Sequence, residues 1–73
     1  MYIIQDQSNN QLALIYRNMI LNPSGDKVLG IAVGDCLFNA HSKVFGKIIQ
    51  LNAYDQKGSI IGKIILSNPI SNL

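Results

Sequence analysis

The sequence predicts an all-β protein made of four antiparallel hairpins, each about 16 residues long. Three observations lead to this prediction. Tight-turn signals recur at a nearly constant spacing, and each is followed by a short apolar run that contains one small residue. The apolar runs are rich in Ile, Val, Leu, Phe and Tyr, the residues that suit a pleated, half-buried strand. In addition, no window of ten or more residues shows the periodicity of an amphipathic helix.

The turn signals are four-residue stretches that begin with Asp or Asn. In the last stretch, Asp55 can accept hydrogen bonds from the backbone two residues on, and Gly58 supplies the left-handed conformation that closes a type I turn with a bulge. The fourth position is Asn9, Gly25 or Ser42 in the other stretches. The spacings between turn starts are 16, 17 and 16 residues, so we expect one extra residue near position 26 or 27. The four stretches are 6–9, 22–25, 39–42 and 55–58.

A small residue recurs at one position of each apolar run. Pairing across the last turn would place Tyr54 opposite Ile60, with Gly62 and Ile64 on the same face. Glycine weakens a strand, so its recurrence needs a reason. The repetition favours a close approach of four backbones near a central axis, or a bend in the strand, over an aromatic ring lying on the glycine. The recurring residues are Ala13, Gly30, Gly46 and Gly62.

These segments resemble the bacterial four-fold β-flower proteins, whose hairpin repeats surround a pseudo-four-fold axis. The resemblance covers residues 2 to 66, and its best copies are Phe38 to Ile48 and Tyr54 to Ile64. It implies four petals around such an axis, and it supplies no functional residues because the family has no established activity. Short hairpin repeats with the pattern Tyr-Asp-x-x-Gly also occur in YD-type and MORN-type repeats, which remain alternative relatives.

Composition sets limits on the class of protein. The chain has 73 residues, 48% of them apolar and only 14% charged, with a net charge of +2. We expect one domain over residues 1–66 and a short tail over 67–73. The start of the chain lacks the pattern of a signal peptide, and no apolar stretch is long enough for a membrane span, so we expect a cytoplasmic protein without a membrane partner. The composition suggests a bacterial or phage source.

No catalytic set can be assembled from the sequence, so we expect no enzyme, no cofactor and no metal. His41 is the single histidine and lies in a turn, where an exposed side chain is expected. Cys36 is the single cysteine and is expected to be a small buried apolar residue. The recurring Asp or Asn at the turn starts could form a ring of oxygen ligands, but turn-forming hydrogen bonds explain it better.

A weak binding surface is possible on the lysine-bearing strands. Lys47 and Lys63 follow Gly46 and Gly62, so they are expected in equivalent places. Together with Tyr54 and Phe38 they could form a platform for an acidic ligand or single-stranded nucleic acid. The alternative is a solvated strand face with lysine stems covering apolar surface. Nucleic acid is the less favoured partner, because the basic residues form no continuous run.

We therefore expect an interaction module that self-associates, with a protein partner also possible. A small single domain buries a limited core, and hairpins arranged radially would leave strand edges that pair with another copy. A homo-oligomer is expected, with a dimer favoured, and the apolar segment near the chain end is the expected interface. The predicted interface residues are Ile65, Leu66 and Ile70.

Overall fold

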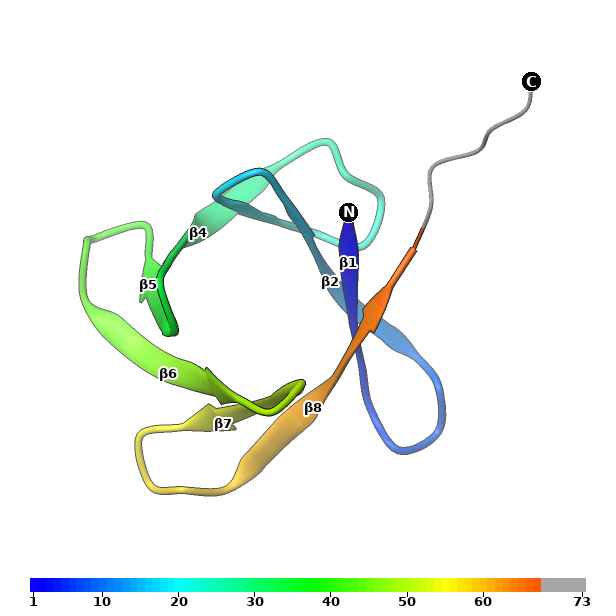
Figure 1. Ribbon diagram of the computed structural model, residues 1–73. Coiled ribbons are helices and arrows are strands. Elements are labelled where there is room, and N and C mark those ends of the chain that lie inside the picture. Colours follow the sequence, from blue (N-terminus) through cyan, green and yellow to red (C-terminus); the bar gives the residue numbers. More distant parts are fainter. Residues whose placement is uncertain (68–73) are drawn as a thin grey trace.

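The computed structural model describes residues 1–67, which form eight antiparallel strands and no helix. The strands follow one another around a closed barrel in the order of the sequence, as Figure 1 shows. The all-β, antiparallel prediction is therefore confirmed. The strands are β1 (Tyr2–Gln5), β2 (Gln11–Tyr16), β3 (Met19–Leu21), β4 (Val28–Val33), β5 (Cys36–Asn39), β6 (Val44–Ile49), β7 (Asn52–Asp55) and β8 (Ile60–Leu66).

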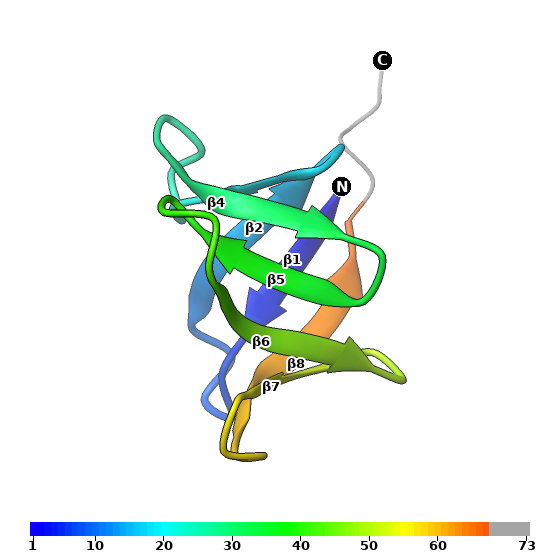
Figure 2. The same cartoon turned by 90° about the vertical axis from the view of Figure 1, so that its left-hand side faces the viewer.

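The barrel closes because β1 pairs with both β2 and β8. The Ser67 amide extends this seam by donating a hydrogen bond to the Met1 carbonyl oxygen at 2.8 Å. The expectation of free strand edges is wrong, because every strand has a hydrogen-bonded neighbour on each side. Figure 2 shows β4, β5 and β6 side by side in the barrel wall. Closure removes the unpaired edges that could template pairing with another chain.

All four predicted turns form. In each, the fourth residue donates its amide to the carbonyl oxygen of the first, over distances of 2.9 to 3.0 Å. The fourth residue has a positive φ in every turn, and this includes Asn9 (65°) and Ser42 (63°), as predicted. These turns join β1 to β2, β3 to β4, β5 to β6 and β7 to β8. The side-chain types at the turn starts therefore predicted the local backbone correctly.

The predicted extra residue is also present in the second turn. The first residue of the other three turns donates its amide to the carbonyl oxygen four residues on, whereas Asn22 donates to Lys27, five residues on. The side chain of Asn22 adapts to this longer loop. Its amide oxygen accepts from the Asp26 and Lys27 amides, at 3.0 and 3.2 Å. The insertion thus stays within the loop and leaves the strands unchanged.

Three shorter connections join the remaining strands, and the sequence analysis did not identify them. Each has two residues between the strands, the loop length of the tightest hairpins. Such loops require positive φ, and Arg17, Gly34, Gln50 and Leu51 adopt it. Only Gly34 is a residue type that announces this conformation. Since connections alternate along an antiparallel chain, the short loops lie at the opposite end of the barrel from the four longer turns.

The core is a narrow cluster of aliphatic side chains inside the barrel. Leu37 and Ala53 have no exposed surface, and Ile4 and Ile20 take the equivalent places on β1 and β3. The predicted pair of Tyr54 and Ile60 forms, but a bulge follows it and Ala53 then pairs with Gly62. Because the bulge adds one residue to β8, Ala53 and Gly62 face the core while Ile60 is exposed.

The small residues are explained by a close backbone approach between neighbouring strands, so the predicted meeting of four backbones near a central axis is wrong. A Cβ added at Gly46 would meet the carbonyl oxygen of Tyr54 on the adjacent strand β7. A Cβ at Gly30 or Gly62 would likewise meet a neighbouring carbonyl, that of Phe38 or Gln5. The contact therefore involves pairs of adjacent strands, one pair at each glycine, as the barrel wall curves.

Candidate binding surfaces

The outer wall of the barrel carries the side chains that alternate with the core residues along each strand. Cross-strand pairing arranges these outer side chains in rows around the circumference. Residues that precede the four longer turns stand at equivalent places, each flanked by one residue on either neighbouring strand. The four are Gln5, Leu21, Phe38 and Tyr54. The rows they centre differ sharply in chemistry, and this difference divides the surface into two sectors.

One sector is apolar and extends over β2 to β6. Leu21 lies between Leu14 and Val28, and the next row places Phe38 between two further aliphatic residues. Val28 is 51% exposed, so the sector is open to solvent. Through Ile3 and Ile65 the first row continues onto β1 and β8. We call this surface the apolar sector, and it consists of Leu14, Leu21, Val28, Ile31, Phe38 and Val44.

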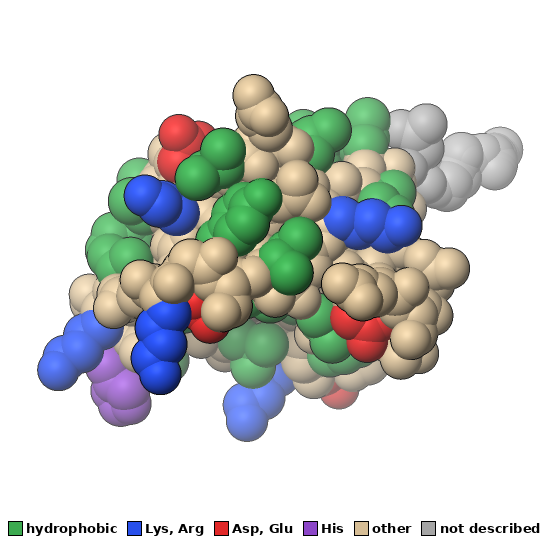
Figure 3. Space-filling view, turned by 90° about the horizontal axis from the view of Figure 1, so that it is seen from below, with side chains coloured by type: hydrophobic (Ala, Val, Ile, Leu, Met, Phe, Trp, Pro, Cys, Tyr) green, Lys and Arg blue, Asp and Glu red, His purple; other side chains and the backbone are tan. Residues whose placement is uncertain are grey.

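The other sector covers β6 to β8, the adjoining part of β1 and the first residue of β2. Here Tyr54 lies between Lys47 and Ile60, and Gln5 lies between Lys63 and Gln11. On the face of the molecule shown in Figure 3, hydrophobic side chains are interspersed with lysine and acidic side chains. We call this surface the polar sector, and it consists of Gln5, Gln11, Lys47, Asn52, Tyr54 and Lys63.

A groove of about 710 Å³ lies in the polar sector between β6 and the turn that joins β7 to β8. Its outer-wall pair is Lys47 and Tyr54, and the turn adds Asp55 and Lys57. The Gln56 side-chain amide donates a hydrogen bond to the Val44 carbonyl oxygen, which fastens the turn to the start of β6. We call this the Lys47 groove, lined by Cys36, Val44, Gly46, Lys47, Ile49, Tyr54, Asp55, Gln56, Lys57 and Gly58.

A second groove, of about 510 Å³, occupies the equivalent place between β8 and the first turn. Lys63 takes the place of Lys47, while Gln5 stands where the first groove has Tyr54. This groove, which we call the Lys63 groove, contains one lysine, one aspartate and no aromatic residue. Its lining residues are Gln5, Asp6, Gln7, Ser8, Ile60, Ile61, Gly62 and Lys63.

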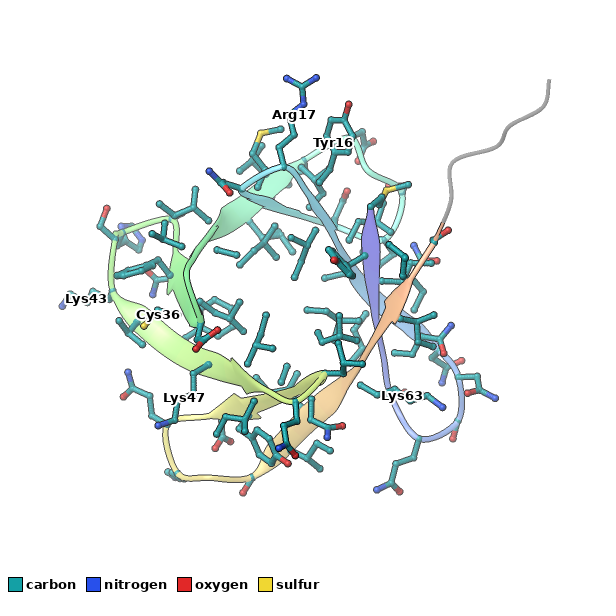
Figure 4. The ribbon with its side chains drawn as sticks, viewed as in Figure 1. Tyr16, Arg17, Cys36, Lys43, Lys47 and Lys63 are labelled. Carbon is teal, nitrogen blue, oxygen red and sulfur yellow. The ribbon has the colours of Figure 1, made fainter. Side chains whose placement is uncertain are left out.

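The residues predicted as one binding surface are thus separated. Lys47 and Tyr54 are directly paired across β6 and β7. Lys63 lies elsewhere on the circumference, as Figure 4 shows, and Phe38 belongs to the apolar sector. Lys57, on the turn after β7, lines the same groove as Lys47. Both grooves could have been found from the sequence, because each contains a lysine that directly follows a glycine, Lys47 after Gly46 and Lys63 after Gly62.

The polar residues at the turn starts are engaged in their own turns. Asp55 Oδ1 accepts from the amides of Lys57 and Ser59, both at 2.9 Å, and Asn39 Oδ1 accepts from those of His41 and Lys43. The amide of Asn10, aided by other hydrogen bonds, lowers the pKa of the Asp6 carboxyl. The structural explanation of this polar set is therefore confirmed. Among residues 1–67, no three His, Cys, Asp or Glu side chains group as metal ligands.

His41 lies in the turn after β5, and Cys36 lies at the start of β5. His41 is exposed in its turn, as predicted, and its side chain is visible at the surface in Figure 3. Cys36 is half-buried on the outer wall beside Lys47. It is therefore less buried than the sequence analysis expected. Within the described part of the chain, no helix is long and apolar enough to cross a membrane.

Two of the three predicted interface residues are described by the structure. Leu66 is 63% exposed and pairs with Tyr2, whereas Ile65 is half-buried against Ile3. Ile65 stands at the border of the apolar sector, because Ile3 pairs with Leu14. Ile70 lies outside the described residues. The sequence analysis overlooked most of the apolar sector, which arises only when the short loops bring β2 to β6 together.

With the geometry established, the chain was compared with known proteins. No protein-family model, curated protein or solved structure matches it. The resemblance to four-fold β-flower proteins therefore stays a prediction, and the functional argument depends on the surfaces described above.

Proposed function

We propose that this protein is a non-catalytic interaction module that self-associates through its apolar sector, with a symmetric dimer as the basic unit. The observation that carries the proposal is the extent of exposed apolar surface. Three of the six sector residues, Val28, Ile31 and Val44, are among the large hydrophobic side chains that are exposed in residues 1–67, and the other three are half-buried beside them. Monomeric soluble proteins rarely leave contiguous apolar patches of more than a few hundred Å² open to water.

The apolar sector can supply the centre of a dimer interface. A stable interface buries about 800 Å² on each partner, which is about a sixth of the 4982 Å² surface of this protein. The two apolar rows extend over five of the eight strands. A two-fold axis through such a patch would place identical side chains against one another, as self-complementary interfaces require. The phenyl ring of Phe38, in the middle of its row, would serve as the central anchor.

A β-flower-like architecture of four hairpin repeats around a pseudo-four-fold axis forms part of this proposal. Four turns with the same hydrogen bond, and small buried residues at matching positions, support it. In such an arrangement each hairpin repeat contributes one outer row at the same position. The rows centred on Leu21 and Phe38 are apolar. Association would therefore use the side of the molecule that carries these two rows and leave the polar sector accessible.

The test is a mass measurement in solution over a wide concentration range, because a dimer has twice the 8.0 kDa mass of one chain. We expect dimers that dissociate on dilution, and we expect Leu21→Gln to weaken them strongly. Ile65→Lys, at the border of the sector, should weaken them less. A folded monomer at every concentration would refute the proposal.

A further inference from the structure

We propose that the Lys47 groove binds a small organic anion that combines a planar ring with one phosphate or carboxylate group. This site shares Val44 with the apolar sector, and its other lining residues lie outside that sector. The proposal depends on three features of the groove: its pre-formed shape, its mainly apolar lining, and the charge balance at its edge. The turn of the equivalent Lys63 groove is held by the same aspartate hydrogen bonds, but that groove has no aromatic lining and its lining charges balance.

The shape of the groove is fixed by hydrogen bonds within the turn 55–58. Asp55 Oδ1 holds two backbone amides, and the Gly58 amide donates to the Asp55 carbonyl oxygen at 3.0 Å. Gln56 then fastens this rigid turn to β6. A wall held in this way loses little conformational freedom when a ligand binds, which favours affinity. The volume of about 710 Å³ is typical of small-molecule sites.

The lining favours a ligand with an apolar, planar body. Cys36, Val44, Ile49 and Tyr54 contribute carbon and sulfur surface. Tyr54 is half-buried, so its ring is held by the wall but still reaches the groove. An aromatic side chain offers a face or edge for stacking with another ring, and small-molecule sites are generally lined in this way.

The edge of the groove favours an anionic group. Two ammonium groups, from Lys47 and Lys57, face one carboxylate, from Asp55, so the balance is positive. Both lysines are exposed, and lysine is a compact point charge that binds phosphate or carboxylate oxygen. Their charges come from different elements, β6 and the turn, so they can approach one anionic group from two sides. The Lys63 groove has one lysine against Asp6, so its lining charges balance.

The experiment follows backbone amide signals by NMR while the whole protein is titrated with phenyl phosphate and, separately, with benzoate. Inorganic phosphate and phenol serve as the two halves of the ligand. We expect saturable shifts of the Lys47, Tyr54 and Gly58 amides. We expect phenyl phosphate or benzoate to bind about tenfold more tightly than either half. Whichever of phenyl phosphate and benzoate binds more tightly identifies the anionic group as phosphate or carboxylate.

Matched variants test the assignment. Lys47→Gln and Lys57→Gln should each weaken binding by about tenfold. Lys63→Gln, at the equivalent place in the other groove, should leave it unchanged. Equal weakening by Lys63→Gln, or no saturable shift, would overturn the proposal. It would also be overturned if single-stranded oligothymidylate bound more tightly, with steep salt dependence and equal sensitivity to Lys47 and Lys63, because nucleic acid would then be the ligand. The same spectra show that each variant is folded.

Discussion

The apolar and polar sectors present different chemistry on the same backbone. Phe38 and Tyr54 stand at equivalent places before their turns, yet one pairs with Ile31 and the other with Lys47. Inside the barrel the same strands carry Leu37 and Ala53, both fully buried. The comparison shows that turn residues, small residues and inward side chains determine the barrel, while the outward residues are free to define what the protein contacts.

The largest expected effect comes from breaking the shared interior. Leu37→Ala should lower the free energy of unfolding by about 3 kcal/mol, because it leaves a cavity where a side chain is fully buried. Denaturant unfolding measures this loss. Phe38→Ala, the adjacent residue on the outer wall, is the matched control and should destabilise the isolated chain less. Equal losses in the dissociated protein would show that the interior and the outer wall are not separable.

Substitutions at the glycines where strands approach closely should lower the stability nearly as much. Gly46→Ala places a Cβ against the Tyr54 carbonyl and should cost about 2 kcal/mol, since the backbone must shift. Ala13 already carries a Cβ at the equivalent position on β2, so Ala13→Gly should cost only about 1 kcal/mol or less. Thermal melts compare the two. A neutral Gly46→Ala would contradict the backbone-contact explanation.

Two substitutions in the turns should change the stability by smaller amounts and in opposite directions. Gly58 has a φ of 86°, so Gly58→Val should cost about 1 kcal/mol because a β-branched residue resists this conformation. Ser42 adopts the same region without glycine, so Ser42→Gly should stabilise by about 0.5 kcal/mol. Chemical denaturation measures both changes. If both substitutions shift stability in the same direction, the two turns are not equivalent.

The smallest effect concerns pH. Hydrogen bonds lower the pKa of Asp6, chiefly that from the Asn10 amide, and the Asn22 and Ser24 side chains lower that of Asp26. A carboxyl group whose pKa is lowered in the folded state stabilises the protein above about pH 4. This stabilisation is lost as the pH falls through the folded-state pKa of the group. The urea midpoint should therefore drop slightly between pH 6 and pH 3. Asp6→Asn should flatten this pH dependence, because an amide does not titrate. The fold should accept the substitution, since Asn22 and Asn39 start the equivalent turns.

The sequence predicted what depends on local chemistry. Turn starts, the extra residue after Gly25 and the pairing of Tyr54 with Ile60 follow from residues close together in the chain. It did not predict closure, because the pairing of β1 with β8 joins distant segments whose registers no local signal specifies. The short loops were also missed, since Arg17, Gln50 and Leu51 are not typical of positive φ.

The candidate surfaces were predictable only in part for the same reason. Lys47 and Tyr54, which the sequence analysis grouped, do pair across β6 and β7. Phe38 was placed with them on aromatic character alone, but its neighbours across β4 and β6 are Ile31 and Val44. A row of outer residues is defined by three strands at once, and the bulge after each longer turn shifts which residues face outward.

The most direct test of the account compares Phe38→Gln with Tyr54→Gln by sedimentation equilibrium. Gln5 already occupies the equivalent place, so the fold accepts glutamine there. We predict that Phe38→Gln converts the dimer to a folded monomer, while Tyr54→Gln associates as the unmodified protein does. Circular dichroism confirms that both variants are folded. Equal association of the two variants, or dissociation by Tyr54→Gln alone, would contradict the division into an associating apolar sector and an accessible polar one.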